Sequence, residues 1–156
     1  MGSVQIEGKN PVIEALQRNR RQVHRVLIDK QSREGEKIRA LLHLAAERGV
    51  PVEWVERSVL KKMTNGRVHN GVVAMAEPLP HYTVQSLVEQ AYSATNSPLI
   101  VVADEIVYEH NLGAILRSAL GAGANGLIIP NRRGTGVSPV VARVAMGGAE
   151  EIPVVR

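Results

Sequence analysis

Polar side chains suited to binding an anion follow an apolar run that ends at Asp104. Asn111 is placed to cap a helix, and Gly113 leaves room for another backbone or a ribose beside the first turn. Arg117 lies one turn beyond Gly113. Because helical side chains lean toward the helix N-terminus, its guanidinium should reach the mouth of the preceding loop. A planar fork of donors there suits a phosphate or a developing oxyanion. An amphipathic helix with a surface arginine and a routine cap is the competing interpretation.

A second polar loop follows the next apolar run and carries Arg132 and Arg133. Two cations on a glycine-rich backbone are typical of a phosphate-contacting loop, although charged loops of this kind are common. The glycines from Gly121 to Gly126 match the dinucleotide-binding pattern, but a helix is predicted before them and a strand after them, the reverse of what that function needs. They predict a helix-to-strand turn instead. The histidines show no paired spacing for a metal, so we expect no metal site.

The segments that must position these loops alternate as strand, helix, strand, helix, strand. Apolar runs at 98–104, 126–130 and 152–155 predict parallel strands, the first of them buried. A helix from about Asn111 connects the first two, and a helix capped by Ser138 and started by Pro139 connects the last two. This order predicts a parallel βαβαβ sheet with its ligands beyond the carboxyl ends of the strands. The last strand would lie at a sheet edge with exposed apolar side chains, which predicts association with another chain.

The first 76 residues predict a separate, smaller α/β domain. A proline-containing linker at 77–83 divides it from residues 84–156, which begin with a helix around 84–91. Asn10 and Pro11 are expected to be the N-cap and first residue of a helix. Strands are predicted at 23–29, 52–55 and 72–76, and a helix from about Glu34 to Gly49. The chain is therefore expected to hold two α/β domains.

Charge and composition narrow the class of partner. The net charge is +4, and residues 1–80 hold 14 lysines and arginines against 9 acidic residues. This bias favours a polyanion, because neutralised phosphates release counterions, although a solubilising surface explains it equally well. Aromatic residues make up 3%, so base stacking should contribute little. No apolar run is long enough to span a bilayer, and the absence of cysteine fits a reducing compartment, so we expect a cytoplasmic protein without a membrane partner.

The chain resembles the SpoU (TrmH-like) family of RNA ribose 2'-O-methyltransferases. The resemblance rests on the segment DEIVYEHNLGAILRSALGAGANGLIIPNRRGTGVSPVVARVAMGGAEEIPVVR, with EGKNPVIEAL and HNGVVA marking the ends of the N-terminal domain. It is closest to the subgroup that modifies a guanosine of large-subunit ribosomal RNA. Tyr108 and Glu109 stand where the family usually has Asp-Pro.

The resemblance implies a fold and a set of site residues. The fold would be a small L30e-like N-terminal α/β domain, followed by the first half of a SPOUT α/β-knot domain. Catalysis would involve Asn111 and Arg117, with Glu109, His110 and Gly113 shaping their loop. The residues implied to contact ribosomal RNA are Lys9, Asn10, His69, Asn70, Arg132 and Arg133.

The methyl donor implied by the resemblance is S-adenosylmethionine. The family's later motifs, which form its knot and hold this cofactor, would lie beyond Arg156. Residues 1–156 alone are therefore expected to lack most of the cofactor pocket and to be inactive. The family also implies a homodimer. A non-catalytic RNA-binding module and an α/β interaction domain without RNA or cofactor remain the alternatives.

Overall fold

The computed structural model describes residues 2–156 and consists of two compact units, Met1–Leu79 (unit 1) and Pro80–Arg156 (unit 2). The boundary between them falls inside the proline-containing segment 77–83. Each unit has its own sheet and its own apolar core. Among the described residues, no helix is both long and apolar enough to cross a membrane.

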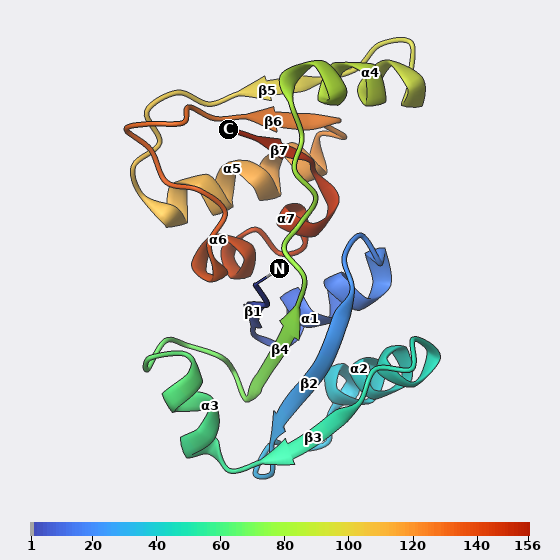
Figure 1. Ribbon diagram of the computed structural model, residues 1–156, viewed down its shortest axis with the longest axis vertical. Coiled ribbons are helices and arrows are strands. Elements are labelled where there is room, and N and C mark those ends of the chain that lie inside the picture. The colour runs from blue at the N-terminus through green and yellow to red at the C-terminus, as the bar shows by residue number, and fades with distance from the viewer. Residues whose placement is uncertain (1) are drawn as a thin grey trace. The chain divides into compact units, whose positions relative to one another are not determined.

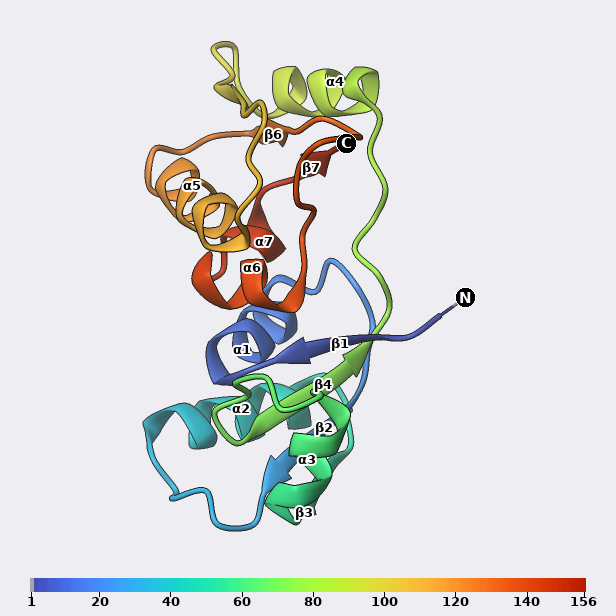
Figure 2. The same ribbon diagram turned by 90° about the vertical axis from the view of Figure 1, so that its left-hand side faces the viewer.

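Unit 1 is built on a mixed sheet of four strands (Figure 1). The strands are β1 (Val4–Glu7), β2 (Val23–Asp29), β3 (Val52–Val55) and β4 (Val72–Ala76), in the spatial order β1-β4-β2-β3. Strand β4 runs antiparallel to both of its neighbours, whereas β2 and β3 are parallel. The carboxyl ends of β1 and β2 therefore meet the amino end of β4 at one edge of the sheet, the edge formed by these strand ends (Figure 2).

Helices cover the two faces of this sheet unequally. The helices α1 (Lys9–Arg18) and α2 (Glu36–Glu47) pack through Leu16 and Leu41 against the face that presents Val26 and Ile28 of β2. Side chains alternate along a strand, so Leu27 points to the opposite face. There it packs with Leu60 of the short helix α3 (Arg57–Met63).

The structure of unit 1 corrects the predicted start of one helix and adds two elements. Helix α1 begins at Lys9 with Gly8 as its N-cap, so Asn10 is not the cap and Pro11 is not the first helical residue. Gly8 has φ 109°, a conformation that favours glycine, and its N–H donates to Val72 O at 2.9 Å, which fixes the turn from β1 into α1. Strand β1 and helix α3 were not predicted.

Unit 2 confirms the predicted parallel βαβαβ order. Its strands are β5 (Ile100–Val102), β6 (Gly126–Ile128) and β7 (Val154–Val155), in the order β5-β6-β7. Helix α4 (Val84–Ala94) precedes β5, α5 (Glu109–Gly121) joins β5 to β6, and α6 (Pro139–Val144) with α7 (Gly148–Glu151) joins β6 to β7. Leu112, Leu116 and Leu127 lie in the core between α5 and the sheet.

Two predictions from local residue types in unit 2 are confirmed, the start of α6 and the turn before β6. Ser138 caps α6 by accepting from the N–H of Val141, and Pro139 is the first helical residue. The glycine run does form the turn between α5 and β6: Gly123 has φ 72°, and a side chain at Gly126 would overlap Leu87.

Other predictions for unit 2 are wrong. Helix α5 begins at Glu109 after Tyr108, so Asn111 lies inside its first turn and is not a cap. Strand β5 is an edge strand rather than a buried one, and Val102 is 71% exposed. At the opposite edge, Ile152 and Val155 are buried because α7, which the sequence did not predict, turns the chain so that both face the core.

Candidate functional site

The four residues predicted to bind RNA in unit 1 lie at one edge of its sheet. Lys9 and Asn10 open α1 directly after β1, and His69 and Asn70 directly precede β4. A backbone hydrogen bond of 2.9 Å from Gly8 N to Val72 O joins these segments, and another of the same length from Asp29 N to Gly71 O ties the second segment to the end of β2. Residues about 60 positions apart in sequence are thus brought together.

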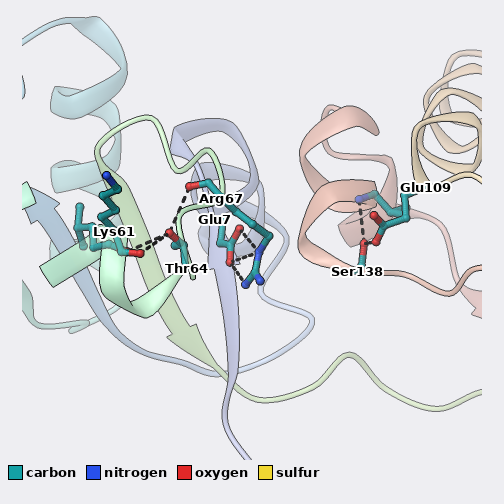
Figure 3. A network of polar contacts seen from close by, with 8 residues as sticks. Glu7, Lys61, Thr64, Arg67, Glu109 and Ser138 are labelled. Carbon is teal, nitrogen blue, oxygen red and sulfur yellow. Dashed lines mark hydrogen bonds and ion pairs between the residues drawn. The ribbon is translucent and has the colours of Figure 1, made fainter. Parts of the chain in front are cut away.

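A buried ion pair holds this edge in shape (Figure 3). The Glu7 carboxylate is fully buried and accepts from Arg67 Nε at 3.1 and 3.2 Å and from Arg67 Nη2 at 2.5 Å. The Thr64 hydroxyl donates to Leu60 O at the end of α3 and lies 3.2 Å from Arg67 O. Thr64 therefore fixes the start of the loop that leads to His69 and Asn70, and Glu7 fixes its middle at Arg67.

His69 lies between two ion pairs and is nearly buried. Its Nδ1 accepts from Gly71 N at 3.1 Å, so the neutral ring carries its proton on Nε2. Burial lowers the pKa of His69 below 6.5, and the charge of Arg57 lowers it further, while Asp29 and Glu7 act in the opposite direction. Asp29 is itself buried and accepts from Arg57 at 3.2 Å. His69 is therefore neutral at pH 7.

In unit 2, two loops meet beyond the carboxyl ends of the strands. Thr135 N donates to Ile106 O at 2.9 Å, which joins the loop after β6 to the loop after β5. The Ser138 hydroxyl donates a short hydrogen bond to the carboxylate of Glu109, as Figure 3 shows. Glu109 is the first residue of α5 and Ser138 caps α6, so this bond ties the starts of two helices together. Glu109 thus contacts the residue that caps α6, a partner that its sequence position did not reveal.

Both loops contain a residue in a strained backbone conformation. Glu105 has φ 52° and Arg133 has φ 61°, in the left-handed region that non-glycine residues rarely adopt. Such residues persist only where their surroundings over-determine the backbone, and they concentrate at functional sites. The bonds of Thr135 and Ser138 supply that constraint for Arg133.

The position of Gly113 suggested room for a ribose beside the helix, but the structure leaves no such room. It is buried, and a Cβ there would lie 2.6 Å from Val144 Cβ and 3.1 Å from Val141 O. The missing side chain lets α6 approach α5, which places Ser138 within reach of Glu109. Gly113 instead allows the close approach of another backbone, which was the other part of the expectation.

Asn111 and Arg117 both lie on the exposed surface of α5. Neither side chain forms a hydrogen bond or ion pair with another residue in 2–156. They are six positions apart, which in a helix corresponds to roughly 9 Å along the axis and about 120° around it. His110 lies seven positions before Arg117, which places the two residues within about 20° of each other around the helix. Arg132 and Arg133 are likewise exposed and unpartnered within the described chain.

Two hollows, one in each unit, are not lined by these residues. A hollow of about 690 Å³ in unit 1 lies at the helix C-termini, where Arg48 donates to Leu16 O at 3.2 Å. A hollow of about 380 Å³ in unit 2 is lined by Val101 and by Ala114, Ile115, Ser118, Ala119 and Ala122 of α5. No group of three or more metal-ligating side chains was found in residues 2–156. Asn111 and Arg117 are exposed on α5 and line neither of these two hollows.

Family models cover both units. Residues 5–82 match the family described as "RNA 2'-O ribose methyltransferase substrate binding", and residues 98–156 match the "SpoU rRNA Methylase family". The chain belongs to the SpoU family. The predicted membership is confirmed, and the family's two models follow each other along the chain in the order of the two units.

Curated SpoU relatives are longer than this chain. The 23S rRNA (guanosine-2'-O-)-methyltransferase RlmB of Pseudomonas putida is 38% identical over 150 residues, which are 96% of this chain and 60% of the relative. The enzyme of the same name from Escherichia coli K12 is 31% identical over 99% of this chain and 63% of its own length. The chain therefore spans about 60% of the length of these SpoU relatives.

Solved SpoU structures share the fold. The SpoU methyltransferase AviRb from Streptomyces viridochromogenes, in complex with the cofactor AdoMet, is 26% identical with a TM-score of 0.72 over 99% of this chain and 55% of that one. An AdoMet-bound rRNA methyltransferase from Sinorhizobium meliloti, 24% identical with a TM-score of 0.69, agrees in fold over 99% of this chain and 54% of its own.

Proposed function

We propose that this chain is the RNA-facing part of a ribose 2'-O-methyltransferase that acts on a guanosine of large-subunit ribosomal RNA. The names of the two RlmB relatives describe that reaction on 23S rRNA. One observation supports the proposal most directly. The loop after β6 presents Arg132 and Arg133 exposed and without partners in residues 2–156, in a backbone where Arg133 is strained, and helix α5, which follows the other loop, presents Arg117 on its exposed surface.

The role of Arg117 follows from its chemistry. Methylation of a ribose 2'-hydroxyl removes a proton from that oxygen and leaves negative charge on it as the bond forms. An arginine keeps its proton in proteins, so it is a poor proton acceptor but a good donor to such an oxygen or to the adjacent phosphate. Arg117 is proposed to make that contact. Asn111, exposed in the first turn, would hold the RNA backbone in line, and positioning of this kind can supply much of the rate enhancement.

The methyl donor would be S-adenosylmethionine, which supplies a methyl group on a sulfonium. The hollow of unit 2 does not fit it, because five of its six lining residues are apolar and Ser118 is the only polar one. None of them carries a charge that could pair with the carboxylate or the ammonium of a methionine moiety. We propose that the cofactor pocket requires segments that the relatives possess outside the matched region, and that residues 1–156 alone are inactive.

The test uses labelled S-adenosylmethionine and a transcript of large-subunit ribosomal RNA. An enzyme that contains residues 1–156 together with the segments that complete it should transfer label to a guanosine 2'-oxygen. Arg117→Lys keeps the charge but loses the planar fork, and we expect turnover to fall at least tenfold. Undiminished turnover would exclude the fork geometry as the source of activity.

A non-catalytic RNA-binding module is the second candidate function. It is supported by the edge of unit 1 that brings Lys9, Asn10, His69 and Asn70 together. Calorimetric titration of residues 1–156 with S-adenosylmethionine and with RNA distinguishes the proposals about this polypeptide. We expect salt-sensitive RNA binding without tight cofactor binding. Tight cofactor binding would show that these residues hold a complete pocket.

Self-association is part of the same proposal. Strands β5 and β7 form the two edges of the unit 2 sheet, so their outer backbone groups lack a strand partner among residues 2–156. Exposed edges of this kind favour pairing with another chain. Light scattering should report a mass above that of the monomer, and a monomer at micromolar concentration would contradict this part.

A further inference from the structure

Helix α3 has a cationic outer face that the sequence motifs did not single out. Leu60 is fully buried and Met63 packs beside it, so these two residues define the inner face. At 100° per residue, Lys61 and Lys62 then lie on the outer side of the helix together with Ser58, whereas Arg57 lies at its flank and donates to Asp29. This outer face contains no acidic residue.

The lysines of this face differ from most cations of unit 1 in having no partner. Arg25 pairs with Glu53, Lys30 with Glu56, and Arg67 with Glu7. Lys61 and Lys62 are exposed and form no ion pair or side-chain hydrogen bond with any residue in 2–156. Their charge is therefore available to an external anion.

Two contacts hold the cationic face against the edge that carries Lys9, Asn10, His69 and Asn70. At its start, Arg57 donates to the buried carboxylate of Asp29, whose N–H binds Gly71 O. At its end, Thr64 joins Leu60 O to Arg67 O, and Arg67 binds Glu7. Figure 3 shows the second contact. The helix is thus fixed at both ends to the loop beside His69.

We propose that the outer face of α3 binds the RNA backbone, with Lys61 and Lys62 contacting phosphates next to the edge residues. The inference rests on the proposed function, because it assumes that unit 1 faces RNA. It extends that function by assigning a phosphate site to α3, which covers the sheet face opposite to the one that α1 and α2 cover. Contacts of this kind position RNA without reading its sequence.

The test compares two double variants in the intact chain, with a transcript of large-subunit ribosomal RNA as the probe. Lys61→Gln with Lys62→Gln removes two charges from α3. The control, Lys37→Gln with Arg39→Gln, removes two charges from exposed, unpartnered positions on α2, which covers the other face of the sheet. All four positions are exposed, and Trp54 fluorescence checks that unit 1 remains folded.

Each lost phosphate contact should reduce the slope of log affinity against log salt by about 0.7 to 0.9. The α3 variant should therefore bind more weakly, and the deficit should shrink roughly 7- to 12-fold between 50 and 200 mM salt. The α2 variant should match the wild type. If both variants lose affinity equally, or neither does, while the wild type binds RNA, the α3 site is refuted and the proposed function stands. If the wild type itself does not bind RNA, RNA recognition by unit 1 fails as well.

Discussion

Substitution of Gly113 by alanine tests the contact that brings α5 and α6 together. The new Cβ would lie 2.6 Å from Val144 Cβ and 3.1 Å from the carbonyl oxygen of Val141. Neither atom is the tip of a flexible side chain, so α6 itself must shift. Overpacking costs about 1–3 kcal/mol, and a rigid neighbour places this site in the upper half of that range. Alanine recovers up to about 1 kcal/mol through its helix propensity. The net expectation is a loss of roughly 1–2 kcal/mol.

A matched control lies in the same helix. Gly121 is exposed at the end of α5, has nothing within 4 Å of its Cβ position, and should gain about 0.4–1 kcal/mol on substitution by alanine. Native-state hydrogen exchange of peptides from α5 and α6 is the appropriate assay, because the only tryptophan, Trp54, lies in unit 1. Exchange should become about 5- to 30-fold faster in the Gly113 variant and slower in the Gly121 variant. A Gly113 variant as stable as the wild type would refute this account of the α5–α6 contact.

Three further perturbations have defined outcomes. Loss of either partner of the Glu109–Ser138 bond, by Glu109→Ala or Ser138→Ala, should speed tryptic cleavage at Arg132 and Arg133, and the double variant should cleave more slowly than the product of the two effects predicts. Arg67→Ala leaves the Glu7 carboxylate buried without its partner and should cost unit 1 about 2 kcal/mol in a urea titration followed by Trp54 fluorescence. This is less than the roughly 3–5 kcal/mol of a fully buried pair, because Arg67 is 40% exposed. An unchanged midpoint would show that the pair contributes nothing.

The third concerns pH. Since the pKa of His69 is lower in the folded chain than in the unfolded one, protonation favours unfolding. Its contribution to stability is therefore complete above about pH 6.5 and is lost as the pH falls below that value. His69→Asn keeps an acceptor for Gly71 N and should flatten this part of the pH profile; an unaltered profile would contradict the assignment.

Elements with strong periodic or chemical signals were predictable from the sequence. Strand β2 and helix α4 were found because apolar residues recur at the expected spacing, and the start of α6 because Ser138 and Pro139 have the required cap and φ preferences. The short elements β1, α3 and α7 were missed. Each has seven residues or fewer, and α3 carries two lysines and an arginine in that span, so no periodic pattern emerges.

Features that depend on distant residues could not be predicted. The sequence predicted room for a ribose at Gly113. It could not show that Gly113 packs against Val144, because Val144 belongs to a helix about 30 positions away in sequence. The Arg67–Glu7 pair joins residues 60 positions apart, and it explains why the loop before His69 has a fixed shape. The residue types at the candidate site were recognisable, whereas the bonds that hold them followed only from the tertiary structure.

Ribose methylation in living cells gives the most direct test of the proposed function. In the organism that encodes this chain, the gene should be deleted and 2'-O-methylation mapped along the large-subunit ribosomal RNA. The account predicts the loss of one methyl mark on a guanosine, restored by the intact gene and not by a version carrying Arg117→Ala. A methylation map identical to that of the parent strain would contradict it.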